Sequence, residues 1–128
     1  MRLEWGETNA RDVESITDLD VALDTLAVEM RAEPAMVELF AADSSSLSIG
    51  LGRPWSVISY IGPTGDPPYF HSVAVDPVTE EDPVVFLFRG QYSDFPPQSC
   101  VLTDVAREAA RLFFRTGKRP TNVTWEED

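Results

Sequence analysis

The pattern of hydrophobic and polar residues changes period several times along the chain, between helical spacing and the two-residue alternation of strands. Apolar residues at helical spacing predict an amphipathic helix that begins at Thr17 as N-cap and ends before Pro34. A second amphipathic helix is predicted with Thr103 as N-cap, and Gly117 is expected in the left-handed position that ends it. Each helix has one apolar face, so each is expected to pack against another layer.

Strand patterns occupy most of the region between the two helices. The segments with buried or alternating patterns are Met36–Ala41, Leu47–Leu51, Trp55–Tyr60, Phe70–Val75 and Val84–Phe88. The last is the most hydrophobic and is expected to be central in the sheet. Leu3–Trp5 is expected to be a short edge strand or an ordered arm, and a terminal strand ends in Trp125. The chain 1–128 therefore predicts a single α+β domain, with a mainly antiparallel sheet of about five or six strands and two helices packed on it.

Three proline-rich segments interrupt this pattern and are expected to be loops. Residues 61–68 hold two glycines and three prolines, which predicts a wide turn. Residues 76–83 (DPVTEEDP) form an acidic loop, and residues 92–97 are aromatic, acidic and bounded by proline. Rigid aromatic side chains beside acids are typical of interfaces with a basic partner, although each aromatic taken singly could equally fold back onto the sheet edge.

The net charge changes the picture of possible partners. The chain carries a formal charge of −12, which disfavours binding to nucleic acid or to an anionic membrane and favours a basic partner. Residues 1–43 hold eleven acids against three arginines, residues 44–99 six against two, and residues 100–128 five against five. Such asymmetry suits the steering of a partner, although acidity could also serve only to keep the protein in solution.

Candidate catalytic chemistry is sparse. His71 is the only histidine, and its place on a predicted strand favours a structural role over that of a general base. Cys100 is the only cysteine, so no intramolecular disulfide is possible, and its apolar neighbours predict a buried thiol. Glu80, Glu81 and Asp82 could bind a hard cation but lack the spacing of a calcium loop. We therefore expect no enzymatic activity, no metal and no cofactor.

The C-terminal third carries a recognisable signature. A hydrophobic strand is followed by Gly and Pro in VVFLFRGQYSDFP (Val84–Pro96), and the second helix closes in FFRTGKRP (Phe113–Pro120) before Trp125. This arrangement resembles a family of immunity proteins from bacterial polymorphic toxin systems, commonly paired with nucleic-acid deaminase toxins. The resemblance implies a protein that binds and neutralises a cognate toxin. Most of the matching positions shape the fold, so they mark a family and not a binding site.

The predicted function is inhibition of the toxin by obstruction of a basic substrate groove, such as a zinc-dependent, cytidine-type deaminase requires. The expected toxin-binding residues lie in proline-stiffened segments and combine acids with aromatic anchors: Asp66, Tyr69, Glu80, Glu81, Asp82, Tyr92, Asp94 and Phe95. Between residues 54 and 99 only Arg89 is available to pair with these acids. An alternative contact surface is the acidic face of the first helix, around Asp20, Asp24 and Glu29.

Two other functions remain open at this point. One is an acidic adaptor for another basic protein, and the other is a small hydrolase that uses carboxylates. The sequence does not define the oligomeric state or the identity of the toxin. It has no apolar run of signal-peptide or transmembrane length, so the expected location is the cytoplasm.

Overall fold

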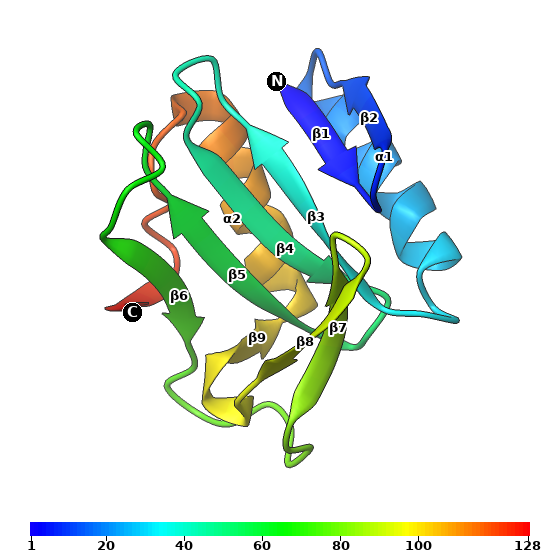
Figure 1. Ribbon diagram of the computed structural model, residues 1–128, viewed down its shortest axis with the longest axis vertical. Coiled ribbons are helices and arrows are strands. Elements are labelled where there is room, and N and C mark those ends of the chain that lie inside the picture. Colours follow the sequence, from blue (N-terminus) through cyan, green and yellow to red (C-terminus); the bar gives the residue numbers. More distant parts are fainter.

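The computed structural model describes residues 1–128 and contains ten strands and two α-helices (Figure 1). The helices are α1 (Ile16–Glu29) and α2 (Thr103–Thr116), and a 3-10 turn spans Pro97–Ser99. The strands are β1 (Arg2–Trp5), β2 (Asn9–Asp12), β3 (Ala35–Phe40), β4 (Ser46–Leu51), β5 (Trp55–Ile61), β6 (Tyr69–Val73), β7 (Val84–Phe88), β8 (Gln91–Phe95), β9 (Cys100–Leu102) and β10 (Thr124–Glu127).

One main sheet organises the molecule, in the order β10-β6-β5-β4-β3-β1-β2. Its neighbouring strands are all antiparallel, and the only parallel contact is a single bridge between Ala35 of β3 and Leu87 of β7. The predicted α+β class, with two helices on a mainly antiparallel sheet, is confirmed. The sheet has more strands than expected, because β2, β8 and β9 are too short or too polar to show an apolar alternation.

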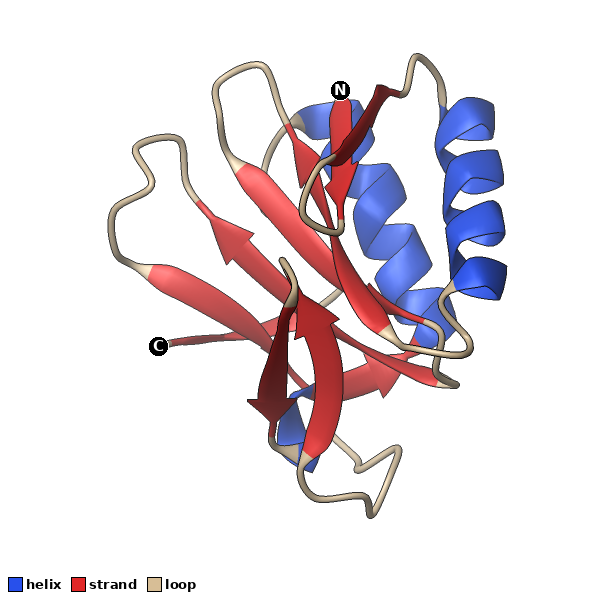
Figure 2. Ribbon diagram, turned by 45° about the vertical axis from the view of Figure 1, so that its right-hand side comes forward, coloured by secondary structure: helices blue, strands red, loops and turns tan.

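Both helices cover the same face of the sheet (Figure 2). Along β3, Val37 and Leu39 point to this face, and Leu19 and Leu23 of α1 meet them in a core of twenty buried side chains. Phe113, which is fully buried, brings α2 into the same core. Apolar periodicity in the sequence therefore identified the layer that holds the fold together.

The helix ends correct two of the predicted caps. Ser15, and not Thr17, is the N-cap of α1, because its hydroxyl accepts a hydrogen bond from the Asp18 N–H at 3.0 Å. The N-cap of α2 is Leu102, which makes no side-chain cap, and Thr103 instead donates to the Pro54 carbonyl at 2.9 Å. The predicted stop is confirmed, because Gly117 adopts a left-handed φ of 67° at the end of α2.

The hydrophobic strand β7 is peripheral, contrary to its predicted central place. It forms a hairpin with β8, and this β7–β8 hairpin folds over the face of the sheet opposite the helices. There Val84 and Phe86 enter a smaller core of five buried residues, together with Met36, Val57 and Cys100. β7 is apolar because it lines this second core and not because it lies in the middle of the sheet.

Segment 92–97, expected to be a loop, is mostly strand. β8 continues to Phe95 and pairs with β7 through a two-residue turn. At the N-terminus, Leu3–Trp5 was expected to be an edge strand or an ordered arm. It is part of strand β1, which lies between β2 and β3 and not at the edge. The edges of the main sheet are β2 and β10.

The predicted terminal strand is present as β10, which pairs with β6. Trp125 is partly buried against the main core, and its indole N–H donates to the Pro120 carbonyl at 2.8 Å. Its ring also meets Tyr60 edge-on, with the centroids 6.5 Å apart. Trp125 therefore fixes the chain after α2 onto the sheet, as expected for a residue that shapes the fold.

Candidate functional site

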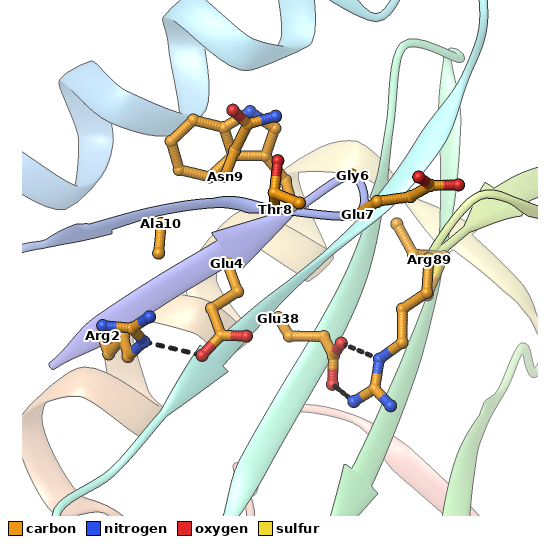
Figure 3. Close-up of a pocket in the computed structure, with 11 residues that line it drawn as sticks. Arg2, Glu4, Gly6, Glu7, Thr8, Asn9, Ala10, Glu38 and Arg89 are labelled. Carbon is orange, nitrogen blue, oxygen red and sulfur yellow. Dashed lines mark hydrogen bonds and ion pairs between the residues drawn. The ribbon is translucent and has the colours of Figure 1, made fainter.

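The face of the sheet opposite the helices is only partly covered by the β7–β8 hairpin. Beside the hairpin tip lies a polar cavity of about 300 Å³, lined by β1, the β1–β2 turn, the start of β2, β3 and Arg89 (Figure 3). Three acidic side chains, Glu4, Glu7 and Glu38, reach this lining. Arg2 and Arg89 supply the positive charge, and each pairs with one of these acids.

The pair between Glu38 and Arg89 ties the hairpin tip to the main sheet. The Nε and Nη2 atoms of Arg89 donate to the two carboxylate oxygens, each at 2.6 Å, which is a bidentate arrangement. Glu38 is only 6% exposed, so little water reaches its carboxylate and the charge is compensated by Arg89. The hydrogen bond to Glu38 raises the pKa of Arg89 above its ordinary value, and the guanidinium stays charged.

The backbone at the hairpin tip favours other residue types. Arg89 has a φ of 50° and Gly90 a φ of 79°, so both central residues of the turn are left-handed. Such a turn prefers Asn or Gly at its first position, and an arginine there carries a conformational cost. The bidentate contact with Glu38 offsets this cost and explains why an arginine is compatible with the turn.

A second arginine holds the other end of the hairpin. Arg53, in the β4–β5 turn, donates to the Val85 carbonyl at 3.1 Å and pairs with Glu81 at 3.1 Å. Its guanidinium also lies over the Phe86 ring, 5.5 Å from the centroid. Glu81 was expected to lack a local partner, and this pairing corrects that expectation. The cation comes from outside segment 54–99, so composition within the segment could not indicate it.

The eight expected binding residues do not form one continuous cluster. Asp66 and Tyr69 lie in or beside the β5–β6 loop, where the Tyr69 hydroxyl donates to the Gly65 carbonyl at 2.9 Å. Glu80, Glu81 and Asp82 lie in the β6–β7 loop, at the opposite end of β6 (Figure 1). The length of β6 separates the two groups, so they would meet different parts of a partner.

Strand alternation divides the three expected residues of β8. Tyr92 and Asp94 are exposed on the outer side of the strand, and the pKa of Tyr92 is raised because its hydroxyl donates to Glu33. Phe95 points to the other side, where it packs on Phe86 with ring centroids 6.2 Å apart. Phe95 therefore supports the hairpin from within, as adjacent residues of a strand face opposite sides.

Unpaired acids gather at the end of the molecule that carries the β6–β7 loop. We call this region the acidic end and define it by Asp76, Glu80, Asp82 and Asp94, all of which are exposed. Asp94 joins the loop acids because it pairs in register with Val85, three residues after Asp82. None of the four forms an ion pair, and the one nearby cation that contacts the loop, Arg53, is already bound to Glu81.

The acidic face of α1 differs from the acidic end. Asp20 accepts from Arg111 at 3.0 Å, and Asp24 pairs with Arg107 at 2.8 Å. These arginines come from α2, so no pattern within the first helix could indicate the pairing. The contacts between the two helices therefore neutralise much of the charge on this alternative surface.

The residues considered for catalysis have structural surroundings. His71 Nδ1 contacts the Asp128 carboxylate, and the residue is partly buried on β6. Cys100 is fully buried as predicted, and burial raises the pKa of its thiol to about 11. No group of three or more His, Cys, Asp or Glu side chains is placed to hold a metal ion. No helix has the length and apolar character needed to cross a membrane.

Comparison with known proteins adds the identity of the family. No curated protein matches the chain. The family model described as Immunity protein Imm1 matches residues 7–127, which is nearly the whole chain. Immunity proteins bind and neutralise a cognate toxin as inhibitors and not as enzymes, so the expected non-enzymatic role is confirmed. The chain belongs to the Imm1 family of immunity proteins.

Proposed function

We propose that the cognate toxin is a nucleic-acid deaminase and that this protein neutralises it by obstructing its basic substrate groove. The observation that supports this most is the acidic end, where four exposed carboxylates have no cation to pair with. A deaminase of this class needs a basic groove that guides nucleic acid to a buried zinc pocket. Exposed carboxylates complement such a groove and would compete with the phosphates of the substrate.

Obstruction requires no chemistry from the inhibitor. The β6–β7 loop carries Glu80 and Asp82 between Pro77 and Pro83, so less conformational freedom remains to be lost on binding. Glu81 belongs to the same contact, although its pairing with Arg53 makes it a support for the loop. The proposed action takes place in the cytoplasm, where the toxin would otherwise reach nucleic acid.

The remaining candidates extend this contact. Tyr92 is 71% exposed on the hairpin and offers an aromatic anchor beside Asp94. Asp66 and Tyr69, at the far end of β6, would meet a second part of the toxin. Phe95 contributes by holding β8 in place beneath these side chains.

Binding kinetics test this proposal. The probe is a catalytically inactive toxin domain from the adjacent open reading frame, measured at about 0.05 and 0.5 M salt. The triple variant Glu80→Gln, Asp82→Asn, Asp94→Asn should associate at least about tenfold more slowly at low salt, because charge complementarity accelerates encounter. Wild-type association should fall steeply at high salt for the same reason.

A matched control removes the same charge elsewhere. Asp12→Asn, Glu14→Gln, Glu29→Gln also changes the net charge by three units, at acids that form no ion pair. This variant should associate nearly as fast as wild type. Slowing in the control alone would move the contact to the side of α1. A toxin domain that cleaves nucleic acid and releases no ammonia from it would refute the deaminase assignment.

A further inference from the structure

An apolar groove lies next to the acidic end. It has a volume of about 200 Å³ and is formed by the β6–β7 loop, the junction between β9 and α2, and residues 122–124. We call it the apolar groove and define it by six of its aliphatic side chains: Val73, Val75, Val78, Leu102, Val105 and Val123. Asp76 also lines it, and no lysine or arginine does.

Two of these aliphatic side chains are strongly exposed. Val75 is 88% exposed and Leu102 is 57% exposed, although the protein has two cores in which apolar groups are buried completely. Exposed aliphatic groups next to a rim of charge are typical of protein interaction sites. The other two exposed valines, Val21 and Val28, lie on α1, away from this groove.

Leu102 also occupies a position where its residue type is unfavourable. It is the N-cap of α2, a place where Ser, Thr, Asp or Asn would accept a hydrogen bond from the first turn. Leucine makes no such bond and leaves the cap unmade. A residue that breaks a local rule while its apolar side chain is largely exposed points to a function at that position.

The charge around the groove defines the kind of partner. Asp76 lies in its lining, and Glu80 and Asp82 follow in the same loop as Val75. A complementary surface would present an apolar side chain surrounded by lysines or arginines. A second copy of this chain fits poorly, because each copy carries a net charge of −12.

We propose that the apolar groove is the anchor point for the toxin and takes an aliphatic or aromatic side chain flanked by cations. The inference rests on the proposed function in that the toxin docks at the acidic end. The carboxylates then govern the rate of encounter, and Val75 and Leu102 govern the lifetime of the complex.

The double variant Val75→Ser, Leu102→Ser tests the anchor with the same inactive toxin domain. Dissociation should become about 30-fold faster, because two buried aliphatic contacts are lost, while the association rate stays within about twofold. The variant should remain folded, since both side chains are exposed and Leu102→Ser introduces a hydroxyl that can cap α2. Its melting temperature, expected to be no lower than that of wild type, verifies this.

Val21→Ser, Val28→Ser is the matched control, because it also removes two exposed aliphatic side chains. It should leave dissociation unchanged. If both double variants dissociate at the wild-type rate while the acidic triple variant associates slowly, the anchor is refuted and the acidic contact stands. If the groove variant dissociates fast while the acidic variant behaves as wild type, the anchor stands without the acidic contact.

Analytical sedimentation tests whether a second copy of this chain occupies the groove instead of the toxin. Wild-type protein should be monomeric in the absence of toxin at the concentrations used for binding. A wild-type dimer that the groove variant converts to monomer, together with unchanged toxin binding, would make the groove a contact between copies and overturn the inference.

Discussion

The two faces of the sheet are stabilised by different kinds of interaction. The helix-covered face holds a core of twenty buried side chains contributed by both helices and several strands, whereas the hairpin-covered face holds only five. The smaller core is supplemented by two arginines, Arg53 at one end of the hairpin and Arg89 at the other. The first face therefore supplies most of the stability. The second positions a hairpin and a loop that carry unpaired acids.

This contrast explains how a small protein can expose so much charge without losing its fold. The carboxylates of the acidic end belong to the unit that contributes least to the main core, so their repulsion acts on the hairpin and its loop. The arginine contacts counter that repulsion where it would lift the hairpin from the sheet. Single substitutions in the two cores and at the hairpin tip can separate these contributions.

The largest expected effect is in the main core. Phe113→Ala should lower the free energy of unfolding by about 3–5 kcal/mol, because the ring is fully buried and leaves a cavity. Urea denaturation measures the change. Phe114→Ala, on the same helix but only partly buried, is the control and should cost clearly less. Equal losses would show that α2 does not depend on its inward face.

A smaller effect is expected where the hairpin meets the sheet. A Cβ on Gly50 would lie 2.6 Å from the Phe86 ring, so Gly50→Ala must displace this ring from the second core and should cost about 1–3 kcal/mol. Hydrogen exchange should accelerate in residues 84–95 and stay slow in β4 and β5. Gly62→Ala, which meets nothing within 4 Å, is the control. Uniform acceleration across the sheet would mean that the two cores unfold as one.

The contact between Arg89 and Glu38 at the hairpin tip should contribute less to stability than either core. Arg89→Ala leaves the buried Glu38 carboxylate without its partner, but the arginine is largely exposed, so we expect a loss of about 1 kcal/mol. Thermal or urea unfolding measures it. Arg2→Ala breaks the exposed pair with Glu4 and should change stability by less than about 0.5 kcal/mol. If the two variants lost the same stability, the contact between Arg89 and Glu38 would not contribute to holding the hairpin on the sheet.

The smallest effect concerns Cys100 in the second core. Burial favours the uncharged thiol and raises its pKa from 9.0 to about 11, so its stabilising contribution is full below pH 9 and is lost as the pH rises towards 11. Alkylation of the thiol at pH 8 should be slow in wild type and faster in Gly50→Ala. Cys100→Ala should show a weaker loss of stability over this pH range. Rapid alkylation of the wild type would indicate that the second core opens readily.

Local periodicity allowed much of the helix-covered face to be predicted. The amphipathic character of α2, its stop at Gly117 and the alternation in β4 are properties of short segments, so the sequence alone was sufficient. The position of β7 was predicted wrongly, because an apolar strand has the same composition in the middle of a sheet and over a second core. The cap at Ser15 was missed because Thr17 offered an equivalent hydroxyl two residues later.

The candidate surface was harder to predict, because its electrostatics depend on contacts between distant segments. Arg53 and Glu81 are 28 positions apart, and Arg89 and Glu38 are 51 apart. No local pattern indicates which acids such arginines neutralise and which they leave free. The exposure of Val75 and Leu102 was likewise hidden, since aliphatic residues beside strands are expected to be buried. The apolar N-cap at Leu102 was hidden too, because Thr103, the next residue, offered a hydroxyl that suited the cap.

The edge strands of the main sheet affect the concentration that this protein can reach in a cell without aggregating. β2 has the sequence NARD and β10 the sequence TWEE, so both open strands present charged side chains. Charged edges discourage another copy from adding a strand, and the net charge of −12 adds repulsion between molecules. A toxin inhibitor protects only while it outnumbers its target. Edges of this kind let the inhibitor accumulate to a stoichiometric excess without edge-to-edge aggregation.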